Sequence, residues 1–304
     1  MNSLIIDISA YSDLEKREEY KPRWGDYWFK EHLKHTFKEL GCPSCETPSP
    51  SVLLHLFGYP LKQIPEHTYK ILWIHSHPDW ITSEILKSYH KIYCISKSFT
   101  EKINKKLSVN MHWLPYPTHM IPLKREKRYD IVFVGNNRQD KKGRKIINDL
   151  VSLFPLPFTI KIWGFGWEGL IPPQWHRGDY FDHQQLNQLY SESKIVLNDH
   201  HEDMRKEGFI NPRILDALAS GSFVITDDLF RINDIIRTHI PVYHRQDELR
   251  NLLTYYLTHD QEREALIKKA QPEALAYAYK RVCSVILEDI RLADALVKQH
   301  TSYE

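Results

Sequence analysis

The sequence predicts an α/β protein built from two doubly wound halves, each with its own parallel sheet. The first observation is that short apolar runs alternate with segments of helical periodicity, which is typical of α/β units. The second is that this alternation restarts after a charged segment at 122–129. The third is size, because 304 residues with 42% hydrophobic and 12% aromatic side chains are enough for sizeable cores and too apolar for a disordered chain.

The first half, which we expect to span 1–121, begins with an apolar strand. Residues 25–40 carry apolar side chains at helical spacing and are followed by Gly41, a residue that commonly ends a helix. A second helix should begin at Ser98, where Ser98 and Glu101 have capping-box spacing. We expect strands at 4–9, 52–57, 69–75 and 92–96, a Pro/Ser-rich loop at 43–51 and a short edge strand at 112–117.

Residues 122–129 are the expected linker, and 130–270 form the expected second domain. We expect strands at 130–134, 159–163, 194–198 and 222–226, and helices at 142–153, 184–191, 211–220, 228–237, 246–258 and 260–270. The segment 271–299 has the spacing of one long amphipathic helix, and residues 271–304 should pack back on the first domain. Ligands bind at the carboxyl ends of parallel strands, so two such halves facing each other predict a site in the cleft between them.

Charge and cysteine content exclude several classes of protein. The chain has 41 Lys and Arg against 39 Asp and Glu, which disfavours a dedicated duplex-DNA binder and a stable nucleic-acid partner. Positive charge is concentrated at 124–145, which is either a solvated linker and helix face or a local anion site. Cys42 and Cys45 have C-x-x-C spacing, but without a second such pair a metal or redox role is not favoured.

The first residues have no basic region before their apolar run, so they are expected to form a strand and not a signal peptide. The sequence contains no apolar window long enough for a membrane span. Four cysteines do not make a disulfide framework in a chain of this length, and free thiols fit a reducing cytoplasm. We expect a cytoplasmic protein, and peripheral contact with the inner face of the membrane stays open.

The densest group of polar residues follows the strand at 194–198. Asn211 precedes a helix whose free N–H groups and positive dipole end favour an anion. Arg213 can fork onto phosphate oxygens, and Asp216, one turn further, can accept two hydroxyls of a ribose. Gly208 would let a ligand approach the backbone. The alternative is an ordinary capped helix in which Arg213 pairs with Asp216.

The run EGFINPRILDALASGSFVITDD at 207–228 resembles the donor-binding signature of GT-B glycosyltransferases of the group-1 type, in particular their CgeB-like (spore maturation type) branch. Further pieces follow in the same order, namely FVGN at 133–136 and then Arg144, IWGFGW at 162–167, and Leu189-Tyr190 before KIVLN at 194–198. The resemblance covers 130–230 well and the first half weakly. It implies a GT-B fold of two Rossmann-type domains, the second of which binds a nucleotide-diphosphate sugar.

The resemblance also implies site residues. Asp216 matches the second acid of the family's Glu-x7-Glu motif, which binds the ribose hydroxyls. The first acid would fall on Gly208, so Glu207, one place earlier, departs from the pattern as the sugar contact. Arg213, with Arg138 or Arg144, would neutralise the diphosphate. The other donor-contacting positions implied are Gly135, Asn136, Gly164, Tyr180, Phe181, Asn198, Phe209 and Asn211, with Tyr180 and Phe181 beside the base.

The acceptor side is expected in the first half. Asp26 is either the base that deprotonates an acceptor hydroxyl or the N-cap of the helix at 25–40. His75 and His77 end a strand and are either base, acceptor contact or structural residues, and as a pair they lack further metal ligands. Asp227 and Asp228 are adjacent, unlike an Asp-x-Asp metal motif, and are expected to cap the next helix.

The expected function is transfer of a sugar, a hexose or a related one, from a nucleotide-diphosphate sugar to a hydroxyl of a glycan, a lipid-linked acceptor or another acceptor, in cell-surface polysaccharide biosynthesis. Fixed arginines would stabilise the departing diphosphate, so no metal and no other cofactor is expected. A DNA-base glycosyltransferase of the phage type and a noncatalytic GT-B-like module that binds a glycan or a partner remain alternatives. The 11 glycines disfavour a G-x-G-x-x-G cradle.

Overall fold

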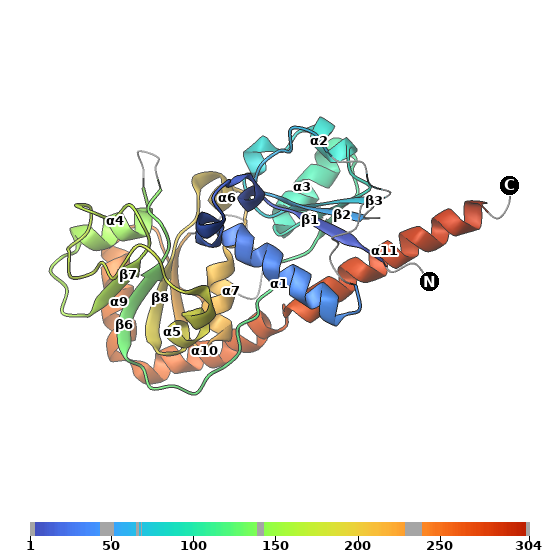
Figure 1. Ribbon diagram of the computed structural model, residues 1–304. Helices are drawn as coiled ribbons and strands as arrows, with labels where there is room; N and C mark the ends of the chain where they lie inside the picture. The colour runs from blue at the N-terminus through green and yellow to red at the C-terminus, as the bar shows by residue number, and fades with distance from the viewer. Residues whose placement is uncertain are drawn as a thin grey trace. The chain divides into compact units, whose positions relative to one another are not determined.

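The computed structural model describes residues 4–42, 52–64, 67, 69–138, 143–228 and 239–301. The chain forms two compact units (Figure 1): unit 1 comprises Met1–Pro117 with Tyr277–Glu304, and unit 2 comprises Thr118–Ala276. The loop expected at 43–51, with Cys45, lies outside the described residues. So do most of the helix expected at 228–237 and two of the basic residues between 124 and 145.

Unit 1 contains a five-stranded parallel sheet with the order β1-β2-β3-β4-β5. All six residues of β2 are buried, as expected for an inner strand of a parallel sheet that is covered on both faces. The edge strand expected at 112–117 is present as β5, but it is shorter and spans Met111–Trp113. The strands are β1 (Ile6–Ser9), β2 (Val52–Phe57), β3 (Tyr69–Ile74), β4 (Lys91–Cys94) and β5 (Met111–Trp113).

Helices α1 and α11 of unit 1 pack against each other and lie side by side in Figure 1. Helix α1 buries Phe29, Leu33 and Phe37, which recur at helical spacing along one face. The helical elements of unit 1 are η1 (Tyr11–Leu14), η2 (Glu18–Arg23), α1 (Gly25–Glu39), η3 (Pro78–Trp80), α2 (Ser83–Lys87), α3 (Lys97–Leu107) and α11 (Tyr279–Thr301).

The cap of α3 differs from the expected one. The hydroxyl of Ser96 accepts a hydrogen bond from the backbone amide of Phe99 at 3.1 Å, so Ser96 is the N-cap. The prediction of Ser98 as the cap is wrong, because the helix begins one residue earlier, at Lys97.

Unit 2 contains a second five-stranded parallel sheet with the order β10-β9-β8-β6-β7. Its central strands bury Phe133, Ile195 and Phe223, which form one core cluster with residues of α4 and α9. The strands are β6 (Tyr129–Val134), β7 (Ile160–Trp163), β8 (Ser193–Asn198), β9 (Phe223–Asp227) and β10 (Val242–Tyr243). The helical elements are α4 (Lys145–Ser152), η4 (His183–Gln185), α5 (Leu186–Ser191), α6 (Glu202–Lys206), α7 (Pro212–Ala219), α9 (Gln246–Thr258) and α10 (Asp260–Leu275).

The C-terminal segment is two helices and not the single helix expected from 271. Helix α10 ends at Leu275 and α11 begins at Tyr279, and the boundary between the two units falls in this break. Helix α10 packs on α7 of unit 2, whereas α11 packs on α1 of unit 1, so the two helices serve different cores. In the ranges that the structure describes, we find no helix long and apolar enough to cross a membrane.

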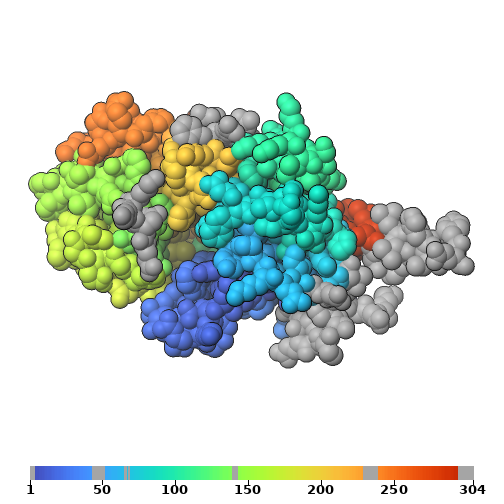
Figure 2. Space-filling model, turned by 90° about the horizontal axis from the view of Figure 1, so that it is seen from above, coloured from blue at the N-terminus to red at the C-terminus, as the bar shows by residue number. Residues whose placement is uncertain are grey.

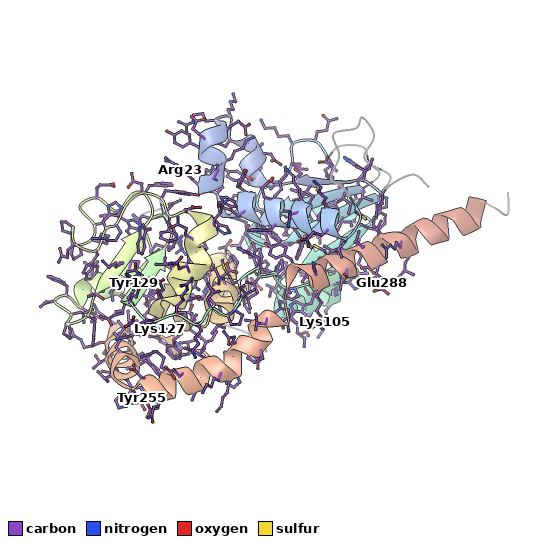
Figure 3. All side chains as sticks on the ribbon, turned by 60° about the horizontal axis from the view of Figure 1, so that its bottom comes forward. Arg23, Lys105, Lys127, Tyr129, Tyr255 and Glu288 are labelled. Atoms are coloured by element: carbon purple, nitrogen blue, oxygen red, sulfur yellow. The ribbon has the colours of Figure 1, made fainter. Side chains whose placement is uncertain are left out.

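The charged segment before β6 belongs to unit 2, which starts at Thr118, upstream of the expected linker. The ammonium group of Lys127, labelled in Figure 3, donates hydrogen bonds to the carbonyls of Ser191 at 2.9 Å and Gly221 at 2.8 Å. These carbonyls lie at the ends of α5 and α7, where a cation is favourable. Burial lowers the pKa of Lys127 to about 8.

Candidate functional site

Two glycines bring the carboxyl ends of β6 and β7 into contact. The amide of Gly135 donates a hydrogen bond to the carbonyl of Trp163 at 2.8 Å. Gly164 has a φ of +134°, and a Cβ at this position would lie 2.2 Å from the carbonyl oxygen of Gly135. Only glycine fits where two backbones approach this closely. The structure therefore brings these two predicted residues together at one edge of the sheet.

Asn136 continues this contact with both its side chain and its backbone. Its Oδ1 accepts a hydrogen bond from the amide of Phe165 at 3.2 Å, and its carbonyl accepts one from Nε of Arg144 at 3.0 Å. The amide side chain thus ties the loop after β6 to the loop after β7, and the backbone orients an arginine that the sequence predicted for the site.

Arg213 is held by the sheet and not by Asp216. Its Nε and Nη2 donate to the carbonyl of Val134 at 3.2 and 2.7 Å, and its Nη1 donates to Oδ1 of Asn198 at 2.7 Å. The guanidinium carbon lies 4.7 Å from the ring centroid of Phe133. Burial lowers the pKa of Arg213, but a guanidinium still keeps its proton at physiological pH. The result is a fixed positive charge at the carboxyl ends of β6 and β8.

Two further arginines share one buried carboxylate. Nη1 of Arg144 lies 2.8 Å from Oδ1 of Asp199, and Nη2 of Arg138 lies 3.4 Å from the same oxygen. The Asp199 side chain is 0% exposed, and its Oδ2 is buried without a hydrogen-bond partner. Burial alone would raise the pKa of Asp199, but the charges of Arg144 and Arg138 hold it below its ordinary value. The charge of Arg213 also lowers the pKa of Asp199, so three arginines act on this carboxylate.

The imidazole of His200 connects three elements behind these arginines. Its Nδ1 lies 2.6 Å from Oδ1 of Asp227, and its Nε2 lies 3.1 Å from the backbone nitrogen of Asn211. Because a backbone N–H can only donate, Nε2 accepts and the proton resides on Nδ1. The backbone amide of His200 donates to the other oxygen of Asp227 at 3.0 Å. Asp227 thus accepts both of these hydrogen bonds from His200, and the helix that it was expected to cap lies mostly outside the described residues.

Helix α7 begins where the sequence predicted. Asn211 is the N-cap, and its Oδ1 accepts a hydrogen bond from the amide of Arg213 at 3.0 Å. Pro212 occupies the first helical position, where its missing N–H costs no hydrogen bond. The positive end of the helix dipole therefore lies at the carboxyl edge of the sheet, beside the side chain of Arg213.

Asp216 is paired with Thr118, a residue that the sequence did not single out. The Thr118 hydroxyl donates to Oδ1 of Asp216 at 2.7 Å, and no described residue donates a hydrogen bond to Oδ2. Burial raises the pKa of Asp216 to about 7. One carboxylate oxygen is thus held in place while the other can accept a hydroxyl of a ligand.

Gly208 ends a short helix that the sequence did not predict. Its φ is +70°, and the amide of Phe209 donates to the carbonyl of Met204 at 2.9 Å, as in a Schellman motif at the end of α6. A side chain at 208 would therefore strain the fold as well as crowd any ligand. The Phe209 side chain is fully buried, and its contact with a donor stays a prediction. Glu207, the C-cap of α6, is half-buried.

The two aromatic residues expected beside a base have different environments. The ring of Phe181 packs edge-on against Trp163, with centroids 5.0 Å apart at 73°. The side chain of Tyr180 is 44% exposed. Phe181 thus supports the end of β7, and Tyr180 is the one of the two that has ring surface available to a ligand.

In unit 1, Asp26 is not a helix cap. The N-cap of α1 is Trp24, and Oδ2 of Asp26 accepts a hydrogen bond from the backbone amide of Ser12 at 2.8 Å. An N-cap side chain would accept a hydrogen bond from an amide of its own helix. The bond of Asp26 goes to a residue of η1, so it ties η1 to the first turn of α1. Burial raises the pKa of Asp26.

His75 and His77 follow β3 but occupy different environments. His75 is buried, its Nδ1 lies 2.6 Å from the hydroxyl of Tyr116, and its Nε2 is buried without a hydrogen-bond partner. Burial, with a smaller contribution from His77 and His55, lowers the pKa of His75 to about 3. The ring of His77 stacks on Trp80 with centroids 4.3 Å apart.

One group of residues in unit 2 has the spacing of a metal site. The side chains of Glu168, His176 and Asp179 bring ligand atoms within 4.8 Å of one another, and both acids are exposed. The imidazole of His176 lies 3.1 Å from the carbonyl of Gly164 and 3.5 Å from the carboxylate of Asp179. These contacts account for the arrangement without a cation, so the group does not by itself define a metal site.

Sequence reasoning did not single out Asp199, His200 or Thr118, and it expected Asp227 only as a helix cap. Asp199 and His200 directly follow the apolar strand β8, and Asp227 ends β9, so their position at strand ends was a usable signal. Thr118 had no such signal, because 98 positions separate it from Asp216 along the chain.

Residues 138–287 match the family model described as "Glycosyl transferase-like". No curated protein matches the chain in sequence. Solved structures resemble it along most of its length. Sucrose-phosphate synthase (tll1590) from Thermosynechococcus elongatus has 13% identity and a TM-score of 0.60, with 93% of this chain and 81% of that chain covered.

Two further similar structures contain a bound nucleotide sugar. Anabaena Alr3699/HepE in complex with UDP-glucose has 10% identity and a TM-score of 0.60, with 94% of this chain and 99% of that chain covered. A variant of T4 phage BGT in complex with UDP-glucose has 13% identity and a TM-score of 0.57, covering 86% and 93%. At such identities the likeness shows the fold. The chain has the GT-B fold, with two Rossmann-like parallel-sheet domains and a helical C-terminal segment, and residues 138–287 are similar to the glycosyl transferase-like family.

Proposed function

We propose that this protein is a glycosyltransferase that moves a sugar from a nucleotide-diphosphate sugar to an acceptor hydroxyl. One observation carries the proposal. The carboxyl edge of the unit 2 sheet, beside the N-terminus of α7, carries three arginines: Arg138, Arg144 and Arg213. Among the described carboxylates, Asp199 pairs with Arg138 and Arg144. A cluster of fixed arginines suits a diphosphate, and fixed cations stabilise the charge that develops on a departing one.

The reaction follows from this arrangement. The acceptor oxygen attacks the anomeric carbon, the bond from that carbon to the diphosphate oxygen breaks, and the nucleoside diphosphate leaves with the electron pair. The unbonded Oδ2 of Asp216 would accept a ribose hydroxyl, and the exposed ring of Tyr180 would pack on the base. Glu207 would contact the sugar. In an inverting transfer the acceptor proton would go to Asp26, whose raised pKa suits a base better than the buried His75.

The finer parts of the proposal concern the cofactor, the sugar and the biological setting. The arginines and the helix dipole would do the work of a metal, so chelation with EDTA should leave turnover unchanged. We propose a hexose or related donor, a glycan or lipid-linked acceptor, a cytoplasmic location and a role in cell-surface polysaccharide biosynthesis. We also propose that the protein belongs to the CgeB-like branch, on the basis of the signature at 207–228. Cell fractionation with immunoblotting tests whether a fraction of this protein associates with the inner face of the membrane.

Calorimetric titration with UDP, GDP and ADP tests donor binding, and release of the diphosphate from the corresponding sugar nucleotides tests turnover. Arg144→Gln should weaken binding of the preferred diphosphate by about 10- to 100-fold, because a hydrogen bond to a charged group contributes about 1.5–3 kcal/mol. Arg245→Gln is the matched control, since the side chain of Arg245 is 69% exposed. Absence of binding to all three diphosphates would refute the proposal.

The same experiments separate the alternatives. A noncatalytic module would bind a diphosphate or a glycan without releasing product from any sugar nucleotide. A DNA-base glycosyltransferase would shift duplex DNA in a gel at moderate salt, and the basic residues at 124–145 would make this shift strongly salt-dependent.

A further inference from the structure

We propose that an aromatic strip at the carboxyl edge of the unit 1 sheet binds a carbohydrate chain that carries the acceptor hydroxyl. The strip comprises Tyr11, Trp24, Tyr59, His77 and Trp80. Its role as acceptor site rests on the proposed function, whereas its ability to bind carbohydrate does not.

The rings of the strip form one continuous series of contacts. The centroid of Trp24 lies 5.2 Å from that of Tyr11, and the centroid of Tyr11 lies 5.7 Å from that of Tyr59. Tyr59 meets Trp80 at 6.1 Å, and Trp80 stacks on His77 at 4.3 Å. The contacts of Trp24 with Tyr11 and of Tyr59 with Trp80 are edge-to-face, so neighbouring ring planes are turned toward different directions.

These rings come from three loops on one edge of the sheet. Tyr11 begins η1 after β1, Tyr59 follows β2, and His77 and Trp80 follow β3. This is the edge at which open parallel sheets bind ligands. Asp26 lies next to the strip, because its carboxylate binds the amide of Ser12, the residue after Tyr11. In Figure 2 the N-terminal segment, coloured dark blue, lies on the surface of the molecule.

Three side chains of the strip are exposed although they are large and aromatic, and Tyr59 and His77 are half-buried. The exposed fraction is 37% for Tyr11, 38% for Trp24 and 45% for Trp80. Contiguous exposed aromatic surface marks an interaction site. One face of a pyranose ring presents C–H groups and its rim presents hydroxyls, so a ligand for this strip should offer flat apolar faces with polar edges. A sugar chain has this shape and repeats it from unit to unit.

A cavity of about 410 Å³ adjoins the strip and supplies polar partners. It is lined by Tyr11 and Trp24 from the strip and by Leu14, Glu15, Lys16 and Arg17. Pockets for small ligands have this size and this combination of aromatic walls with a few polar groups.

The polar lining of the cavity carries a net positive charge, from Lys16 and Arg17 against Glu15. Nε of Arg17 lies 3.3 Å from the carboxylate of Glu15, and the Arg17 guanidinium covers the ring of Tyr20, 3.9 Å from its centroid. On the other side of this ring lies Arg23 of η2, labelled in Figure 3, at 4.3 Å. Lys16 is exposed and makes no ion pair with the described residues, so the cavity suits a sugar with a carboxylate or phosphate group.

The test uses the full chain without nucleotide and three hexasaccharides: hexagalacturonate, which is acidic, and the neutral cellohexaose and maltohexaose. Saturation-transfer NMR detects binding, and a titration gives the affinity. Tyr11→Ala and Trp80→Leu should each weaken binding of the best hexasaccharide by about 5- to 10-fold, because each removes a ring face. Trp80→Leu keeps apolar surface but removes the ring, so undiminished hexasaccharide binding in this variant would show that the ring does not contact the sugar and would overturn the proposal.

Tyr255→Ala is the matched control, since Tyr255 is 44% exposed, close to the 37% of Tyr11, and lies in α9 of unit 2. Equal losses in Tyr11→Ala and Tyr255→Ala, or no binding of any of the three hexasaccharides, overturn the proposal. The proposed function is judged separately by UDP, GDP and ADP titrations. Hexasaccharide binding without diphosphate binding would support the strip and refute the transferase, and the reverse result would do the opposite.

Discussion

The imidazole of His200 joins the carboxylate of Asp227 to the backbone amide of Asn211, with distances of 2.6 and 3.1 Å at its two nitrogens. His200 and Asp227 are both buried, so solvent does not compete for these bonds. The link fixes the first turn of α7, the helix that carries Arg213 and Asp216. His200 thus acts as a positioning residue for the candidate site.

His200→Ala should lower the free energy of unfolding by about 3 kcal/mol, because a buried carboxylate loses its partner. It should also weaken diphosphate binding, and His200→Gln, which restores an acceptor near the Asn211 amide, should recover part of it. Urea denaturation and calorimetry measure the two effects. His201→Ala, at an exposed neighbour, should change stability by no more than about 0.5 kcal/mol. Equal effects at the two positions would contradict the link.

Gly164→Ala should destabilise the protein by at least about 3 kcal/mol, because the new Cβ overlaps a backbone oxygen that cannot move alone. That oxygen belongs to Gly135 and lies 2.2 Å from the Cβ position. Gly169→Ala is the matched control, since Gly169 also has a positive φ of +71° but nothing within 4 Å of its Cβ position. The control should lose only about 1 kcal/mol from backbone strain. Thermal unfolding of both variants measures their losses of stability. Similar losses would show that the carbonyl oxygen of Gly135 does not restrict the side chain at position 164.

Asp216 should make stability fall as pH rises. Burial raises its pKa from the ordinary 3.8 to about 7, so the folded protein favours the protonated acid. The stabilising contribution is complete below the unfolded value and is lost as pH rises through about 7. Asp216→Asn cannot lose a proton, so its stability relative to the wild type should increase between pH 4 and pH 8. If denaturation shows a constant difference in unfolding free energy between Asp216→Asn and the wild type across this interval, the raised pKa of Asp216 is refuted.

The buried histidines of unit 1 should make stability fall as pH falls, which is opposite to the effect of Asp216. Burial lowers the pKa of His55 to about 4 and that of His75 to about 3, from an ordinary value of 6.5. Stability from their neutral forms is present above pH 6.5 and is lost as pH falls toward the folded values. His75→Asn should flatten this part of the acid-unfolding profile, whereas His35→Asn, at an exposed position of α1, should leave its shape unchanged.

Segments with a clear apolar pattern were predictable from the sequence, whether as a continuous buried run or as a repeat at helical spacing. Strand β2 and helix α9 occupy the residues expected for them, 52–57 and 246–258. Helix α6 was missed because a five-residue polar segment, in which only Met204 is buried, has no period to detect. The break between α10 and α11 was missed because the apolar pattern continues through it while the packing partner changes.

By itself, the sequence determined the two parallel sheets, the start of α7 at Asn211 and the presence of arginines near strand ends. All of these depend on local pattern and on hydrogen bonds between near neighbours. Only the tertiary structure decided what each charge meets. Arg213 binds the carbonyl of Val134, 79 positions away, and not Asp216 of its own helix, in which five residues are buried. Folding brings distant groups into one low-dielectric site, where the nearest partner and the degree of burial set hydrogen bonding and pKa.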